Sequence, residues 1–95
     1  QIFYSGGNEE SKILAQTLQD NIRTALQPEN SRVIKQATDD IYILYHTKKP
    51  AVLAECGFIS NSSDAAMLTD EEYQNKLAFV IAESTLKYLA EREER

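Results

Sequence analysis

Residues 50–61 read Pro-Ala-Val-Leu-Ala-Glu-Cys-Gly-Phe-Ile-Ser-Asn, and most of the information about the fold lies in this stretch. The near-continuous apolar run over residues 51–58 predicts a strand that is covered on both faces, as in parallel α/β sheets. One carboxylate, Glu55, interrupts the run, and an ionised side chain is costly to desolvate unless it is paired or functional. The stretch therefore predicts a strand and a candidate functional residue.

The segments that precede this stretch predict two more strands and a long helix. Residues 2–4 and 41–45 are short, β-branched and aromatic, which is typical of strands. Between them, Asn8 is a suitable N-cap for a helix that Pro28 ends. Its apolar side chains recur at helical spacing. Residues 31–40 are polar, and we expect them to be irregular.

The segments after it predict two helices. Residues 61–64 offer several N-caps for a short helical turn that continues to Leu68. Thr69 and Glu72 have the spacing of a capping box, which opens the longest helix. One face of that helix is expected in the core, and the charged tail 91–95 is expected to fray.

The resulting order, strand-helix-strand-strand-helix, indicates an α/β fold with helices packed on a sheet. Three strands make a thin sheet for two helices. We therefore expect residues 1–95 to be a fragment of a larger three-layer α/β/α domain. Such a fragment would leave a sheet edge or face uncovered, which favours self-association.

Composition limits the classes of partner. The 95 residues carry a net charge of −5, which argues against a nucleic-acid binder, since a phosphate-binding protein presents a basic face. No apolar run approaches the roughly 20 residues that span a bilayer. The single cysteine forms no internal disulfide.

Glu55 is the strongest candidate for chemistry. Alternation along the strand directs Glu55 and Gly57 to one face and Cys56 to the other. Ligands of open α/β sheets collect beyond the carboxyl ends of strands, so a carboxylate held there in a partly dry site would have a raised pKa and could shuttle protons. The alternative is a strand-end glutamate that is bonded to a loop amide or to an arginine such as Arg32.

Five further polar positions have mainly structural interpretations. His46 is expected at the surface, because a zinc site needs at least three ligands and this is the only histidine. Ser60 and Asn61 are expected to shape and cap the turn after Glu55. Arg32 and Lys35 could contact an acidic peptide or form a solvated loop pair.

The segment 49–68, KPAVLAECGFISNSSDAAML, closely resembles the C-terminal signature of zinc-dependent N-acetylmuramoyl-L-alanine amidases of the amidase-3 type. Members show a Pro-Ala-x-Leu-x-Glu-x-Gly-Phe-x-Ser-Asn pattern, matched here by residues 50–61. The resemblance extends over nearly all 95 residues, and its details are most similar to cell-wall and spore-cortex amidases of spore-forming Gram-positive bacteria.

The resemblance implies a peptidoglycan hydrolase that cleaves the amide between N-acetylmuramic acid and L-alanine by zinc-assisted attack of water. Glu55 would be its catalytic general acid/base and not a zinc ligand. The family's zinc is held by two histidines and a glutamate, within Asp-Pro-Gly-His-Gly and Ser-x-His-x-Asn motifs upstream of the matched region. Neither motif occurs here, so this fragment is expected to bind no zinc and to be inactive alone. An extracytoplasmic, cell-wall location follows from the family only.

Two other functions remain open on sequence alone. The chain could be a non-catalytic α/β module that binds a partner protein or a cell-wall glycan. It could also be a thiol hydrolase with Cys56 as nucleophile and His46 as base, although adjacent strand residues point to opposite faces and Cys56 is expected to pack in the core.

Overall fold

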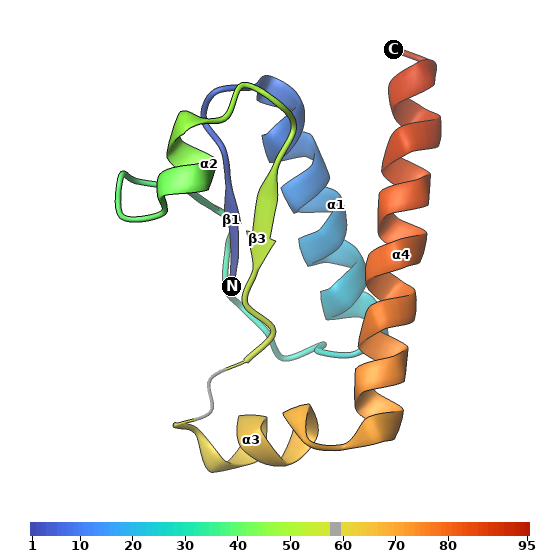
Figure 1. Ribbon diagram of the computed structural model, residues 1–95. Helices are drawn as coiled ribbons and strands as arrows, with labels where there is room; N and C mark the ends of the chain where they lie inside the picture. The colour runs from blue at the N-terminus through green and yellow to red at the C-terminus, as the bar shows by residue number, and fades with distance from the viewer. Residues whose placement is uncertain (58–59) are drawn as a thin grey trace.

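The computed structural model describes residues 1–57 and 60–95, and within them it shows a mixed α/β fold (Figure 1). The predicted α/β class is confirmed. In chain order the elements are β1 (Ile2–Tyr4), α1 (Glu9–Ala25), β2 (Lys35–Gln36), α2 (Tyr42–His46), β3 (Val52–Ala54), α3 (Ser62–Leu68) and α4 (Glu71–Glu93).

The three strands form one sheet in the order β2-β1-β3. β1 runs parallel to β2 and antiparallel to β3, with Phe3 opposite Lys35 on one side and opposite Leu53 on the other. The predicted parallel environment of β3 is therefore wrong, because β3 runs antiparallel to β1, its neighbour in the described sheet. Only Val52–Ala54 of the predicted strand 51–58 has strand geometry, and Phe58 lies outside the described residues.

The core lies between the sheet, α1 and α4. Its buried members are apolar side chains of β1, α1 and α4, namely Ile2, Ala15, Leu18, Ile22 and Leu77. In Figure 1, α1 lies between the strands and α4, while the short helix α2 lies on the other side of the strands. The predicted apolar face of the last helix is confirmed, since its members Leu77, Ser84 and Tyr88 are buried.

Residues 41–45 were expected to form a strand, and this prediction is wrong. Residues 42–46 form the helix α2, in which Leu44 is buried and its neighbours Tyr42, Ile43 and Tyr45 are exposed. A strand would bury every second side chain, whereas this segment buries one residue per helical turn. The strand beside β1 is instead β2, a pair of exposed polar residues within the segment expected to be irregular.

Helix ends differ from expectation at α4 only. Asn8 caps α1 as predicted, accepting a hydrogen bond from the Glu10 N–H at 2.9 Å. Asp70, rather than Thr69, caps α4, because Thr69 ends α3 and its hydroxyl donates to the Ala65 carbonyl at 2.9 Å.

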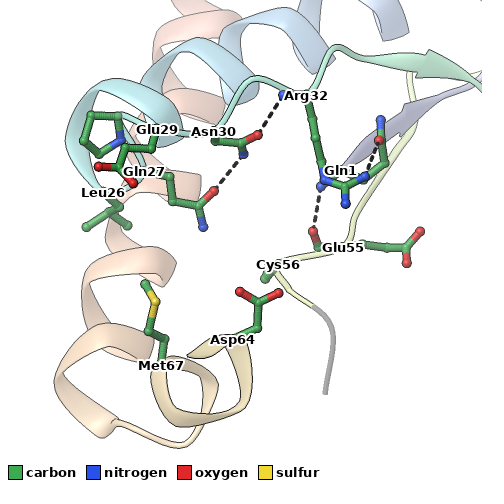
Figure 2. Close-up of a pocket in the computed structure, with 11 residues that line it drawn as sticks. Gln1, Leu26, Gln27, Glu29, Asn30, Arg32, Glu55, Cys56, Asp64 and Met67 are labelled. Carbon is green, nitrogen blue, oxygen red and sulfur yellow. Dashed lines mark hydrogen bonds between the residues drawn. The ribbon is translucent and has the colours of Figure 1, made fainter. Parts of the chain in front are cut away.

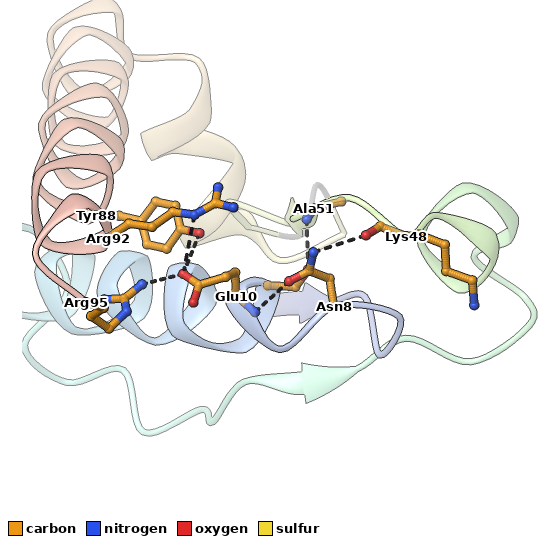
Figure 3. Close-up of polar contacts among 8 residues, drawn as sticks. Asn8, Glu10, Lys48, Ala51, Tyr88, Arg92 and Arg95 are labelled. Atoms are coloured by element: carbon orange, nitrogen blue, oxygen red, sulfur yellow. Dashed lines mark hydrogen bonds and ion pairs between the residues drawn. The ribbon is translucent and has the colours of Figure 1, made fainter.

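The charged tail 91–95 was expected to fray, but most of it is part of α4. α4 extends to Glu93, and its last turns are held to the start of α1 by the Glu10 carboxylate (Figure 3). That carboxylate accepts a hydrogen bond from the Tyr88 hydroxyl at 2.9 Å and pairs with Arg92 at 4.0 Å and with Arg95. These partners, 78 or more residues away along the chain, fix the end of α4.

Candidate functional site

The backbone of Glu55 is fixed against the start of the chain. Glu55 directly follows β3, which pairs with β1 in a register that places Ala54 opposite Ile2. The Glu55 N–H donates to the Gln1 carbonyl at 2.8 Å, and the Glu55 carbonyl accepts from the Gln1 nitrogen at 3.0 Å. Both polar backbone groups of Glu55 are thus hydrogen-bonded, so the point from which its side chain projects is defined.

The side chains around Glu55 alternate as predicted. Ala54 and Cys56 pack against the core, whereas the Glu55 side chain is exposed. In Figure 2 the Glu55 carboxylate points away from Cys56 and Asp64. Glu55 was expected to lie in a partly dry site, and the described residues of this chain do not form one. The sheet face that Glu55 shares with Leu53 is exposed to solvent. Leu53 itself is 39% exposed.

Gly57, two residues after Glu55, lies close to α3. A Cβ atom placed on Gly57 would lie 3.2 Å from the Leu68 side chain and 3.4 Å from that of Asp64. Glycine therefore permits the close approach of α3 at this position. Asn61 caps α3, as predicted, by accepting from the Asp64 N–H at 3.1 Å. Ser60 is exposed in the turn that leads into this cap.

A cavity of about 370 Å³ lies on the other side of the Glu55 backbone (Figure 2). It is enclosed by the first residue, the loop after α1, the end of β3 and the start of α3, and its lining includes Leu26, Gln27, Asn30, Arg32, Cys56, Asp64 and Met67. Four of these lining residues, Gln27, Asn30, Asp64 and Met67, were not predicted from the sequence as site residues. No motif connects them, because the cavity is formed by segments that are distant in sequence.

Arg32 and Lys35, considered together as a possible peptide-binding pair, are separated in the structure. Arg32 lines the cavity, and its guanidinium donates to the Gln1 side-chain oxygen at 3.5 Å. Its carbonyl accepts from the Gln19 side chain at 3.0 Å. Lys35 is an exposed residue of β2 and is not part of the cavity lining.

The arrangement does not favour a thiol hydrolase. Burial raises the pKa of the Cys56 thiol, which disfavours the thiolate that a nucleophile requires. The thiol donates weakly to the Ala54 carbonyl at 3.8 Å. His46 lies on α2, before the start of β3, and its ring contacts Tyr42 and Tyr45 instead. Cys56 packs partly buried against the core, as predicted.

Within residues 1–57 and 60–95, no three histidine, cysteine, aspartate or glutamate side chains gather to hold a metal ion. The described helices also include none that is long and apolar enough to cross a membrane.

Comparison with known proteins establishes the family. The sequence pattern of the Amidase_3 family, described as N-acetylmuramoyl-L-alanine amidase, matches residues 1–87. The match includes the strand end with Glu55, the turn after it and most of α4. The chain therefore belongs to the Amidase_3 family, as the sequence resemblance implied.

Individual relatives agree with this assignment. The chain is 36% identical over 92 residues to the germination-specific N-acetylmuramoyl-L-alanine amidase of Bacillus subtilis, covering 97% of this chain and 38% of that protein. It is 36% identical over 78 residues to the amidase LytC of the same organism, covering 82% of this chain and 15% of LytC. The chain thus spans well under half the length of these relatives.

A solved structure supports the fold. The CwlD amidase from Clostridioides difficile, determined in complex with the GerS lipoprotein, superposes with a TM-score of 0.86 at 39% sequence identity. The likeness covers 95% of this chain and 45% of that one. The described elements are therefore arranged as in part of an amidase domain.

Proposed function

We propose that the protein is a peptidoglycan hydrolase that cleaves the amide bond between N-acetylmuramic acid and the L-alanine of the stem peptide. The observation that carries this proposal is the family match over residues 1–87, which includes Glu55 and the turn that follows it. In this proposal residues 1–95 are the C-terminal part of the catalytic domain, in keeping with their 38% coverage of the germination-specific relative.

Glu55 is the proposed general acid/base. Its carboxylate would take a proton from the attacking water as the water oxygen bonds to the amide carbonyl carbon. It would then give that proton to the alanine nitrogen as the carbon–nitrogen bond breaks, leaving a lactyl carboxylate and a free amine. Two features support this role: the backbone of Glu55 is fixed through both polar groups, and its side chain is open to an approaching substrate.

Zinc dependence is proposed for the whole domain only. The described residues do not fit a zinc ion, because they bring no three suitable ligands together and His46 lies among aromatic rings. The ligands would have to come from residues other than these 95. The 95-residue chain alone is therefore expected to bind no zinc and to hydrolyse nothing.

The proposed cellular location follows from the proposed substrate. Peptidoglycan lies outside the cytoplasm, so we propose that the protein acts at the cell wall.

The role of Glu55 is tested by Glu55→Gln in the whole protein. The amide cannot carry the proton, so we expect amide hydrolysis of purified peptidoglycan to fall by about 10²–10⁴-fold while zinc content stays unchanged. Glu83→Gln, which removes an exposed carboxylate of α4, is the matched control and should retain full turnover. Near-normal turnover of Glu55→Gln would remove Glu55 from the mechanism.

A further inference from the structure

An exposed group of aromatic rings lies on α2, away from Glu55 and from the cavity. Tyr42 is 71% exposed and Tyr45 is 51% exposed. Leu44 is the one buried residue of this helix. The His46 ring lies between them, with its centroid 4.4 Å from that of Tyr42 and 5.1 Å from that of Tyr45. These ring contacts order the three side chains relative to one another while leaving them open to solvent.

The loop that follows the rings carries positive charge. The chain as a whole carries a net charge of −5, yet residues 41–54 contain no aspartate or glutamate and include Lys48 and Lys49. Both lysines are exposed. We call Tyr42, Tyr45, His46, Lys48 and Lys49 the aromatic–cationic patch.

The loop that carries the two lysines is held in place. The Lys48 carbonyl accepts from the Asn8 side chain at 3.1 Å, and the Lys49 N–H donates to the Thr47 hydroxyl at 3.1 Å. In Figure 3 the Lys48 side chain extends away from Asn8 and α1. The backbone contacts therefore position the loop, and the lysine head groups are available to a partner.

We propose that the aromatic–cationic patch binds the glycan strand of peptidoglycan, and this proposal rests on the proposed function. The apolar faces of sugar rings stack on exposed aromatic side chains. Carboxylates of the lactyl groups released by hydrolysis, and of stem peptides, complement Lys48 and Lys49. The strand bears such carboxylates repeatedly along its length, so charge and stacking act together.

A lipid surface fits the patch less well. Helices that lie in a membrane interface present a broad apolar face along several turns. α2 exposes Tyr42, Ile43 and Tyr45, but it has only five residues and so offers a bilayer little more than one helical turn. Aromatic side chains with both a stacking face and a polar edge suit a hydroxyl-rich polymer better.

The test is co-sedimentation of the whole protein with purified insoluble peptidoglycan at two salt concentrations. Replacing both tyrosines (Tyr42→Ala with Tyr45→Ala) should weaken binding about fivefold to tenfold at either salt concentration, because ring contacts are not screened. Replacing both lysines (Lys48→Gln with Lys49→Gln) should weaken binding at low salt and have little effect at high salt.

The matched control removes the same charge as the lysine variant from two exposed lysines elsewhere, Lys12→Gln on α1 with Lys87→Gln on α4. This variant should bind as the wild type does. Thermal melting confirms that each variant is folded, and the lysine variant tests the patch independently if the tyrosine variant is unstable.

Two results would overturn the proposal. One is wild-type binding by both patch variants. The other is a defect of these variants toward anionic phospholipid vesicles with unchanged binding to peptidoglycan, which would make the patch a membrane contact. If the wild type cleaves the amide but the patch variants bind normally, only this inference fails. If patch-dependent binding occurs without amide cleavage, the proposed hydrolase function fails and the glycan contact stands.

Discussion

Glu10 is the residue through which the first turn of α1 and the last turns of α4 are joined (Figure 3). Burial acts to raise the pKa of its carboxyl. The hydrogen bonds from Tyr88 and Arg95 and the charges of Arg95 and Arg92 outweigh this effect, and the net result is a lowered pKa. Burial, together with the same hydrogen bond, raises the pKa of the Tyr88 hydroxyl.

Replacing Glu10 by glutamine is therefore expected to give a pH-dependent loss of stability. A carboxyl whose pKa is lower in the folded than in the unfolded state stabilises the fold above its unfolded pKa, and this contribution disappears as the pH falls through the folded value. The difference in urea midpoint between the wild type and Glu10→Gln should be full at pH 7 and should shrink once the pH falls below the ordinary value of 4.5.

Glu9→Gln is the matched control for this prediction. Glu9 shares the first turn of α1 but is exposed, so its replacement tests the helix dipole without the contacts to α4. A Glu10→Gln effect that is the same at pH 7 and at pH 3, or that Glu9→Gln reproduces, would contradict the role assigned to the Glu10 carboxylate.

At the scale of single residues, the sequence was informative where a local rule decides the outcome. The N-cap roles of Asn8 and Asn61 follow from residue type, and the opposite directions of Glu55 and Cys56 follow from strand alternation. The exposure of Glu55 could not be predicted in this way, because it depends on what covers the sheet.

At the scale of elements, length decided which predictions succeeded. The apolar face of α1 recurs at helical spacing over several turns, and α4 is a continuous segment of 23 residues, so both are long enough to be identified as helices. Residues 41–45 offer only five residues, and a short run of Ile, Tyr and Leu fits a strand or a helix equally well. The two-residue strand β2 has no sequence pattern of its own and exists through its pairing with β1.

The turn between β1 and α1 depends on close packing at Gly7. A Cβ atom at this position would collide with the backbone carbonyl oxygen of Thr47, which leads from α2 toward β3. We expect Gly7→Ala to lower the free energy of unfolding by about 1–3 kcal/mol, as measured by urea denaturation, because a backbone group cannot move aside alone.

The neighbouring glycine provides the control. A Cβ atom on Gly6 would meet the far end of the Gln36 side chain, which can swing away. Gly6→Ala should therefore cost clearly less than Gly7→Ala. Equal losses for the two variants would show that the Thr47 contact does not limit the packing of this turn.

At the scale of the whole molecule, apolar side chains remain on several outer surfaces. Leu53 lies exposed on β3, an edge strand of the described sheet, and Phe79 and Leu86 lie exposed on α4. The α/β class was predictable because alternating strands and helices admit few arrangements. Which strands pair, and what covers the outer faces, depends on contacts between distant segments.

These surfaces predict that the 95-residue chain self-associates. Light scattering coupled to size exclusion should give a mass that rises with concentration, and Leu53→Lys with Phe79→Lys should shift it toward the monomer. Exchanging the exposed Thr24 of α1 for lysine is the control and should leave the mass unchanged. A strictly monomeric, cooperatively melting 95-mer would contradict the view that residues 1–95 are part of a larger domain.

The most direct test of the proposed function is the identity of the products that the whole protein releases from purified peptidoglycan. Mass spectrometry should find stem peptides with a free L-alanine amine together with glycan that carries unsubstituted lactyl carboxylates, and the 95-residue chain alone should release neither. Intact muramyl-peptide linkages after prolonged incubation of the zinc-loaded whole protein, or cleavage at a different bond, would contradict the assignment as an N-acetylmuramoyl-L-alanine amidase.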